Sequence, residues 1–173
     1  MTLTGPLAVI AVLHGYAFGL AIDISCCADI RLCSQDTKFS VWSSQQYSNT
    51  IQMLTVFIQV KEVDIGLAAD IGTLTRLPKS GVPITWVKEV CYTARTFGAD
   101  EALKVGFVSK IESTKATAVA QALRMAENIA SKSPIAVQGT KRIIDYSRDH
   151  TINEGLEYTA GRVKKSTSNA EQN

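Results

Sequence analysis

Apolar residues near the start of the chain form an unbroken run, Leu7-Ala8-Val9-Ile10-Ala11-Val12-Leu13. A run of this length that is followed by His14-Gly15 predicts a buried strand ending in a turn. The glycine-punctuated stretch that comes next predicts a second turn and then a helix that extends to about Ala28. Alternating residues at positions 29–33 predict a further strand. The start of the chain therefore has the order strand, helix, strand.

From residue 67 onward the pattern is mainly that of helices. A helix that begins at Leu67 is expected to stop at Pro78, and a loop that contains glycine and proline follows it. Short helices are predicted at residues 86–95 and 100–104, and a strand is predicted at residues 106–111.

Three capping signals divide the C-terminal part of the chain into helices. Thr114 can cap a long helix in which apolar residues recur at helical spacing. Ser133-Pro134 is a start signal for the next helix, because proline favours the first helical position. Thr151 and Glu154 form a capping box for the last helix. The tail at residues 161–173 is polar and unpatterned, which predicts disorder.

Composition indicates one globular domain and argues against two classes of partner. The chain has 173 residues, of which 46% are hydrophobic and 20% are charged, and these are ordinary values for a globular protein. The net charge is only +2, and basic residues of the tail account for it, so no nucleic-acid surface is expected. The apolar start would have to tolerate His14 and two glycines before it ends at Asp23, which argues against a membrane span.

Three carboxylates, Glu62, Asp64 and Asp70, lie within a short stretch of otherwise small and apolar residues. Burying a carboxylate raises its pKa, and this is how a general acid or base is tuned to work near neutral pH. The alternative is structural: Glu62 and Asp64 lie on a solvated strand edge, and Asp70 lies near a helix start. Spacing alone favours the structural interpretation.

The cysteines and histidines give no sign of a metal site or of a histidine-based catalytic group. Cys26 and Cys27 are adjacent, Cys33 and Cys91 stand alone, and no spacing matches a zinc site. We therefore expect four reduced thiols and no bound metal.

Several segments together resemble the enoyl-CoA hydratase/isomerase (crotonase) superfamily, and within it the Δ3,5-Δ2,4-dienoyl-CoA isomerases. The segments are His14-Gly15 through Asp23, Ala28-Asp29-Ile30-Arg31, Lys61 through Asp70, Thr93-Ala94-Arg95, Ala99-Asp100-Glu101-Ala102-Leu103, Ser131-Lys132-Ser133-Pro134 and Tyr146-Ser147-Arg148-Asp149-His150. The resemblance implies an α/β, crotonase-like fold, of which the chain has only the second half of the ββα spiral core. On this basis we expect a partial core at residues 1–112, a C-terminal helical region at 113–160 and a disordered tail at 161–173.

The resemblance also implies a site and a reaction. Glu62 and Asp70 correspond to an acid/base pair that moves a proton along a conjugated acyl chain, and Asp23 corresponds to a third carboxylate beside them. The N–H of Leu20 corresponds to a backbone amide that holds the enolate oxygen of the acyl-CoA thioester. The thioester supplies the electron sink, so no metal or redox cofactor is implied.

The chain departs from the family pattern in three places. The N-terminal half of the family is missing, and that half supplies the second oxyanion amide and most contacts to coenzyme A. Gly19-Leu20-Ala21 replaces three consecutive glycines, so the Leu20 side chain either intrudes on the thioester or restricts the backbone angles. Residues 41–59 form an insertion without any charge, and it is either a surface loop or, as we favour, non-native sequence such as a translated intron.

Three functional interpretations remain open from the sequence. The first is an isomerase that converts 3,5-dienoyl-CoA to 2,4-dienoyl-CoA in fatty-acid β-oxidation. The alternatives are an inactive fragment that only associates with family subunits, and an enoyl-CoA hydratase. The family implies a trimer or hexamer and a mitochondrial or peroxisomal location, although no targeting signal is visible in this chain.

Overall fold

The computed structural model describes residues 5–40 and 72–170 of the chain. This part divides into two compact units, which are described separately. The first contains residues 9–40 and 72–126, and the second contains residues 127–170 together with residues 5–8. The 41–59 insertion and the carboxylates Glu62, Asp64 and Asp70 lie outside the described residues.

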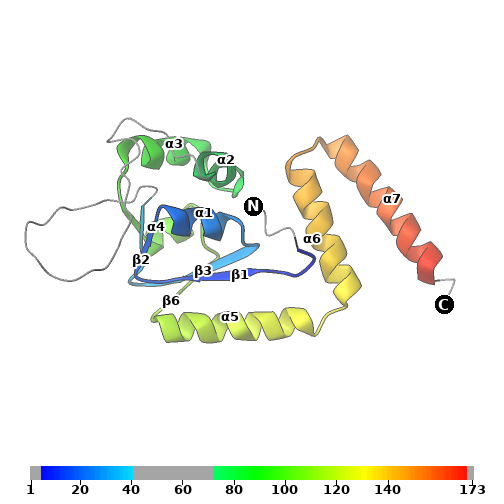
Figure 1. Ribbon diagram of the computed structural model, residues 1–173, viewed down its shortest axis with the longest axis horizontal. Coiled ribbons are helices and arrows are strands. Elements are labelled where there is room, and N and C mark those ends of the chain that lie inside the picture. Colours follow the sequence, from blue (N-terminus) through cyan, green and yellow to red (C-terminus); the bar gives the residue numbers. More distant parts are fainter. Residues whose placement is uncertain (1–4, 41–71, 171–173) are drawn as a thin grey trace, which may run out of the picture. The chain divides into compact units, whose positions relative to one another are not determined.

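The first unit contains two small sheets of three strands each (Figure 1). Strands β1 (Ile10–Leu13), β3 (Ile30–Ser34) and β6 (Lys110–Glu112) form a parallel sheet with β3 in the centre. In the second sheet, β4 (Lys38–Ser40) pairs in parallel with β2 (Tyr16–Phe18) and antiparallel with β5 (Phe97–Gly98).

The chain passes from the first sheet to the second at two tight corners, and this gives a ββα order. Gly15 has a φ of 60° between β1 and β2, which favours glycine there. The backbone N–H of Lys38 donates to the Gly15 carbonyl oxygen at 2.7 Å and so joins the two corners. Helix α1 (Leu20–Cys26) then leads back from β2 to β3. The mixed α/β, ββα arrangement confirms the fold class predicted from the sequence.

The strand predicted at residues 106–111 is wrong in position. The backbone N–H groups of Phe107 and Val108 both donate to the carbonyl oxygen of Ala102. They therefore close the end of α4 (Ala99–Lys104) and are not available to the sheet, so β6 begins only at Lys110. The strand predicted from Leu7 likewise pairs with β3 only from Ile10.

From residue 72 onward the first unit is mainly helical. Its elements are α2 (Thr73–Arg76), the 3-10 turn η1 (Leu77–Lys79), α3 (Ile84–Thr93) and, after α4, α5 (Lys115–Ala130). Pro78 lies inside η1, consistent with the predicted end of the helix at that point. The prediction of one continuous helix from Leu67 is wrong, because Gly72 has a φ of 124° and α2 begins only at Thr73. The Thr117 N–H donates to the hydroxyl oxygen of Thr114 at 3.2 Å, as expected for the predicted cap of α5.

Aromatic side chains form the centre of the first unit's core. Phe39 is fully buried, and its ring stacks on Phe97 with centroids 5.1 Å apart. The rings of Phe107 and Trp86 meet these two edge-on, Phe107 against Phe39 at 5.8 Å and Trp86 against Phe97 at 4.9 Å. The cluster therefore joins β4 to β5 and α3, which lie far from β4 in the sequence.

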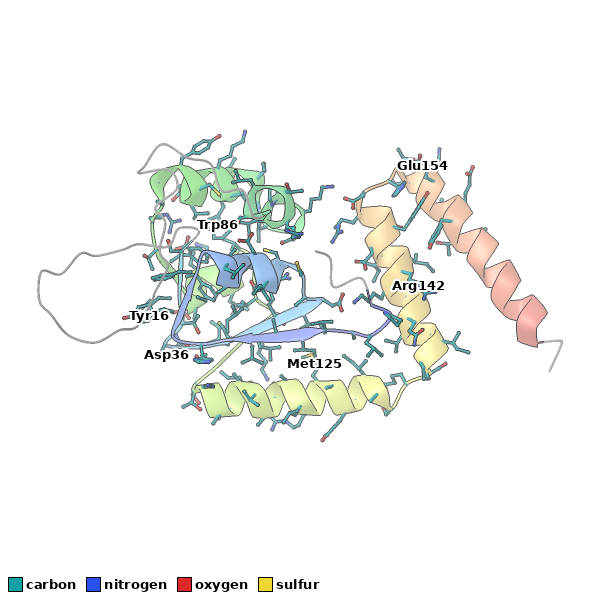
Figure 2. The ribbon with its side chains drawn as sticks, viewed as in Figure 1. Tyr16, Asp36, Trp86, Met125, Arg142 and Glu154 are labelled. Atoms are coloured by element: carbon teal, nitrogen blue, oxygen red, sulfur yellow. The ribbon has the colours of Figure 1, made fainter. Side chains whose placement is uncertain are left out.

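The second unit consists mainly of the helices α6 (Pro134–Arg148) and α7 (Ile152–Ala170). Both predicted start signals are confirmed: Pro134 is the first residue of α6, and the Thr151 N–H donates to the carboxylate of Glu154 at 2.8 Å. Figure 2 labels Glu154 in the first turn of α7. Helix α7 continues to Ala170, into the tail that the sequence analysis expects to be disordered from residue 161. No proline interrupts this stretch, so polar residues simply extend the helix.

Candidate active site

The candidate site begins at the turn between β2 and α1. Gly19 has a φ of 49°, which favours glycine, and its N–H donates to the carbonyl oxygen of Ser40 on β4 at 3.0 Å. Its carbonyl oxygen accepts hydrogen bonds from the N–H groups of Ile22 and Asp23 at 2.8 and 3.3 Å, which starts the helix. The turn thus fixes the first residues of α1 against the second sheet.

Asp23 lies in the first turn of α1 and is only 6% exposed. Its carboxylate oxygen Oδ1 accepts a hydrogen bond from the hydroxyl of Thr73 at 2.5 Å. Thr73 is the first residue of α2 and is itself 1% exposed. The structure therefore places this predicted site residue in a buried position, where a carboxylate needs hydrogen-bonding partners.

Leu20 is the first residue of α1, where a backbone N–H has no partner within its own helix. Among the described residues other than glycine, only Ala94 has a positive φ, so Leu20 has ordinary helical backbone angles. Its side chain is 53% exposed. A side chain at position 20 is therefore compatible with the backbone of this turn, because the left-handed conformation falls on Gly19.

Of the predicted site residues, the structure describes Asp23 and Leu20. Asp23 and Leu20 lie one helical turn apart on α1. Glu62 and Asp70 lie outside the described residues, so their predicted roles stay predictions. Thr73, which the sequence analysis overlooked, is the only described residue that donates a hydrogen bond to the Asp23 carboxylate. The available signal was its position directly after a glycine at a helix start.

Arg31, on β3, binds backbone carbonyl groups at the C-terminal end of α1. Its Nη1 donates to the carbonyl oxygens of Ala28 and Ser25 at 3.0 and 3.3 Å, and its Nε donates to that of Phe107 at 2.6 Å. The guanidinium also lies 5.2 Å from the centre of the Phe107 ring, within cation–π range. Burial lowers the pKa of Arg31 and raises the pKa of the neighbouring Cys26 thiol. We therefore assign both side chains a structural role.

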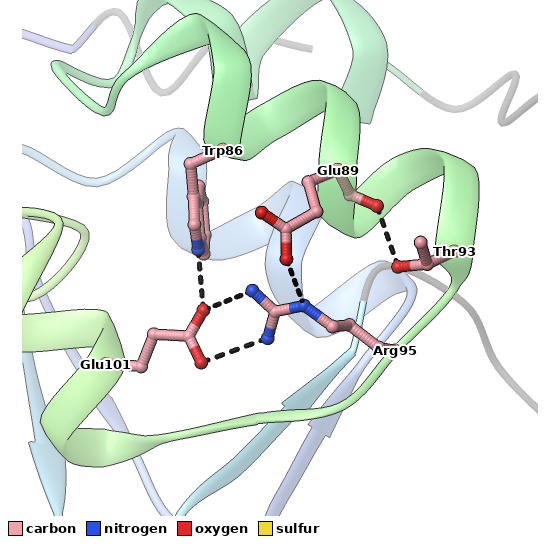
Figure 3. A network of polar contacts seen from close by, with 5 residues as sticks. All are labelled: Trp86, Glu89, Thr93, Arg95 and Glu101. Carbon is pink, nitrogen blue, oxygen red and sulfur yellow. Dashed lines mark hydrogen bonds and ion pairs between the residues drawn. The ribbon is translucent and has the colours of Figure 1, made fainter.

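A polar network supports the helices that follow (Figure 3). The Trp86 indole N–H donates to the Glu101 carboxylate at 2.7 Å, and Arg95 donates to both oxygens of that carboxylate at 2.6 and 3.0 Å. Arg95 also donates to Glu89 at 2.8 Å. Hydrogen bonds from Arg95 are the largest cause of a lowered pKa of Glu101. This network joins α3 to α4, and its hydrogen bonds involve neither Asp23 nor Leu20, the two predicted site residues that the structure describes.

Other site chemistry is not seen in the parts of the chain that the structure describes. Across residues 5–40 and 72–170, no three histidine, cysteine or acidic residues gather in a way that could hold a metal ion. The four cysteines are free thiols, as predicted. Among the described helices, none has the length and apolar character needed to cross a membrane.

A sequence model of the enoyl-CoA hydratase/isomerase family matches residues 50–173, which is well over half of the chain. The chain belongs to the enoyl-CoA hydratase/isomerase family. The resemblance stated from the sequence motifs is thereby confirmed.

Two relatives within the family show how far the similarity extends. The mitochondrial Δ(3,5)-Δ(2,4)-dienoyl-CoA isomerase of Rattus norvegicus is 44% identical over 155 residues, which are 90% of this chain and 42% of that protein. The peroxisomal Δ(3,5)-Δ(2,4)-dienoyl-CoA isomerase of Arabidopsis thaliana is 38% identical over 152 residues, 88% of this chain and 48% of that protein. The chain therefore spans less than half the length of either relative.

Solved structures show that the family fold extends over nearly the whole chain. A putative enoyl-CoA hydratase from Thermobifida fusca, crystallised in complex with acetoacetyl-CoA, superimposes with a TM-score of 0.75. The match covers 96% of this chain and 56% of that one, at 20% sequence identity. It supports the crotonase-like fold of this enoyl-CoA hydratase/isomerase family member.

Proposed function

We propose that the chain carries the carboxylate part of an isomerase that converts 3,5-dienoyl-CoA to 2,4-dienoyl-CoA. The observation that carries this proposal is the 44% identity to a dienoyl-CoA isomerase over 155 of the 173 residues. Because the match covers 155 of the 173 residues, the positions of Asp23, Glu62 and Asp70 all fall within the matched span. The isomerase similarity therefore extends over each proposed site carboxylate.

In the proposed reaction, Glu62 and Asp70 act as the acid/base pair. One carboxylate removes a proton from the acyl chain, and the other returns a proton further along, so both double bonds move and the composition of the substrate is unchanged. Asp23 lies beside the pair as the third carboxylate.

The thioester of the substrate takes up the electrons that the first proton leaves behind. The N–H of Leu20, at the start of α1, is proposed to donate to the enolate oxygen. The exposed Leu20 side chain then lies at the rim of the acyl site. This chemistry requires neither a metal nor a redox cofactor, since proton transfer and the thioester suffice.

The direct test is turnover of a 3,5-dienoyl-CoA by the purified chain. Formation of the conjugated 2,4-dienoyl product is followed by its ultraviolet absorbance, with Glu62→Gln and Asp70→Asn as the variants. Turnover that is lost in both variants would support the isomerase. A folded wild-type sample without turnover would contradict it.

Two alternatives are separated by the same sample. An inactive piece that only associates with family subunits would bind those subunits without turnover. An enoyl-CoA hydratase would instead add water to a 2-enoyl-CoA, which removes the absorbance of the conjugated double bond.

A homo-oligomer is proposed as the working state, a trimer or hexamer as in the family. Large apolar side chains are exposed on both helices of the second unit, including Ile135 and Ile144 on α6 and Ile152 and Leu156 on α7. Exposed apolar side chains of this size favour association. The location is proposed to be mitochondrial or peroxisomal, as for the two isomerases compared above.

A further inference from the structure

The hydrogen bond between Thr73 and Asp23 joins two helices that are far apart in the sequence. The two residues are separated by 50 positions. Thr73 is the first residue of α2 and Asp23 is the fourth residue of α1, and the N-cap residue of each helix is a glycine, which has no side chain to offer. The Thr73 hydroxyl donates to the Asp23 carboxylate and so links the two helices.

The backbone before Thr73 is shaped for this contact. Gly72 has a φ of 124°, which only glycine adopts readily. A left-handed residue at this point turns the chain so that α2 begins with Thr73 against α1. The nearest atoms to a side chain at position 72 would belong to the flexible end of Arg76, so the backbone angle is the main constraint on this glycine.

The Asp23 carboxylate is held by one oxygen only. Oδ1 accepts the Thr73 hydroxyl proton, while Oδ2 has no hydrogen-bond donor among residues 5–40 and 72–170. Because the side chain is 6% exposed, bulk water has little access to this oxygen. A carboxylate fixed through one oxygen presents the other in a defined direction.

From this geometry we propose that Thr73 is a positioning residue for Asp23. Its hydroxyl selects the rotamer of the carboxylate, holds Oδ1 and leaves Oδ2 to face the acyl site. The inference rests on the proposed function in giving Asp23 a place beside the reacting acyl chain. It extends that function by a residue that takes no part in the proton transfer.

The structure offers a matched control in Ser80. The Ser80 hydroxyl contacts the Cys26 thiol, also on α1, and donates to the carbonyl oxygen of Arg76 at 3.0 Å. Ser80 directly follows η1, so Ser80→Ala removes a neighbouring hydroxyl contact to α1 without touching the Asp23 carboxylate. Thr73→Val removes the donor while keeping the shape, and Thr73→Ser keeps the donor.

The first measurement is the carbon-13 resonance of the Asp23 carboxyl group in the full chain, assigned by its loss in Asp23→Asn. We expect the resonance to move in Thr73→Val and to remain at the wild-type position in Thr73→Ser and Ser80→Ala. This measurement is independent of turnover, so it decides the contact even where the isomerase assay fails. A resonance that is unchanged in Thr73→Val, or moved equally in Ser80→Ala, would overturn the proposal.

The second measurement uses the isomerase assay and separates positioning from folding. In a turning-over sample we expect Thr73→Val to lower kcat about 10- to 100-fold with little change in KM, since small misplacements at a site have effects of this order. Thr73→Ser should restore kcat, and Ser80→Ala should keep it. An unchanged kcat in Thr73→Val, or an equal loss in Ser80→Ala, would contradict the role of Thr73.

Discussion

The two units of this chain use the same kind of amphipathic helix in opposite ways. In the first unit, α3 buries Trp86, Val87, Val90 and Cys91 against the sheets. In the second unit, α6 has no buried residue at all, and Ile135 is 77% exposed. The apolar stripe of α3 is thus satisfied within its own unit, whereas that of α6 is not.

An apolar pattern alone predicts the helix but not the surface that covers its apolar face. Periodicity correctly indicates a helix and a face that prefers to leave water. It does not say which surface will cover that face, because the partner can come from the same unit or from another molecule. Substitutions in the two units should therefore differ in what they change, folding in the first and association in the second.

The largest effect is expected in the aromatic core of the first unit. Phe39→Ala removes a fully buried ring that stacks on Phe97, and we expect a loss of about 3–5 kcal/mol in the free energy of unfolding. Urea denaturation followed by circular dichroism measures it. The control is Tyr16→Ala on the adjacent strand β2, where the side chain is 80% exposed. Equal losses in the two variants would contradict the assignment of the core.

A smaller, pH-dependent effect is expected in the network around Glu101. Arg95 lowers the pKa of Glu101 in the folded protein, so this stabilisation is present above the ordinary glutamate pKa of about 4.3. It is lost as the pH falls through the lower folded value. Glu101→Gln should therefore destabilise the protein by about 1 kcal/mol at neutral pH and by less in acid.

The control for this prediction is Glu89→Gln, which removes a single hydrogen bond from Arg95 at a more exposed carboxylate. We expect a smaller loss of stability in this variant. Thermal unfolding of both variants and the wild type at several pH values gives the comparison. If the stability of Glu101→Gln fell with decreasing pH as much as that of the wild type, the predicted contribution of ionised Glu101 would be contradicted.

Local signals allowed the sequence to predict the second unit better than the first. Ser133-Pro134 and the pair Thr151 and Glu154 act within a few residues, and both are helix starts in the structure. The second sheet was not predicted strand by strand, because β2, β4 and β5 are only two or three residues long. Strands so short take their conformation from pairing across the chain and carry almost no periodicity of their own.

The candidate site was predictable only through family motifs. Motif similarity identified Asp23 as a candidate, and the structure places it in a buried position. The contact with Thr73 crosses 50 positions, and no local pattern encodes a pairing of that range. The stretch from Glu62 to Asp70 carries the rest of the proposed chemistry and lies outside the described residues.

A modest effect is expected at the start of α7. Thr151→Ala removes the hydroxyl that donates to the Glu154 carboxylate and accepts from the Glu154 N–H, while the Thr151 backbone N–H still donates to that carboxylate. The largest cause of the lowered pKa of Glu154 is therefore lost, and α7 should lose helical content near neutral pH. Far-ultraviolet circular dichroism measures the loss. In the wild type the same loss should appear as the pH falls through the lowered pKa of Glu154, because the protonated carboxyl group is a weaker acceptor. Thr151→Ser, which keeps the hydroxyl, should behave like the wild type, and an equal loss in this control would argue against capping.

The smallest effect on folding is expected at the exposed isoleucines of the second unit. Ile152 is 83% exposed and Ile144 is 63% exposed, so Ile144→Ser and Ile152→Ser should change the free energy of unfolding of the monomer by no more than about 0.5 kcal/mol. Their effect should appear instead in sedimentation velocity, as a shift of the wild-type oligomer toward monomer. A large loss of monomer stability would mean that these side chains pack within their own unit, and the contrast between the units would disappear. An unchanged oligomer would mean that the association surface lies elsewhere than on α6 and α7. The apolar faces of these two helices would then have no role in association.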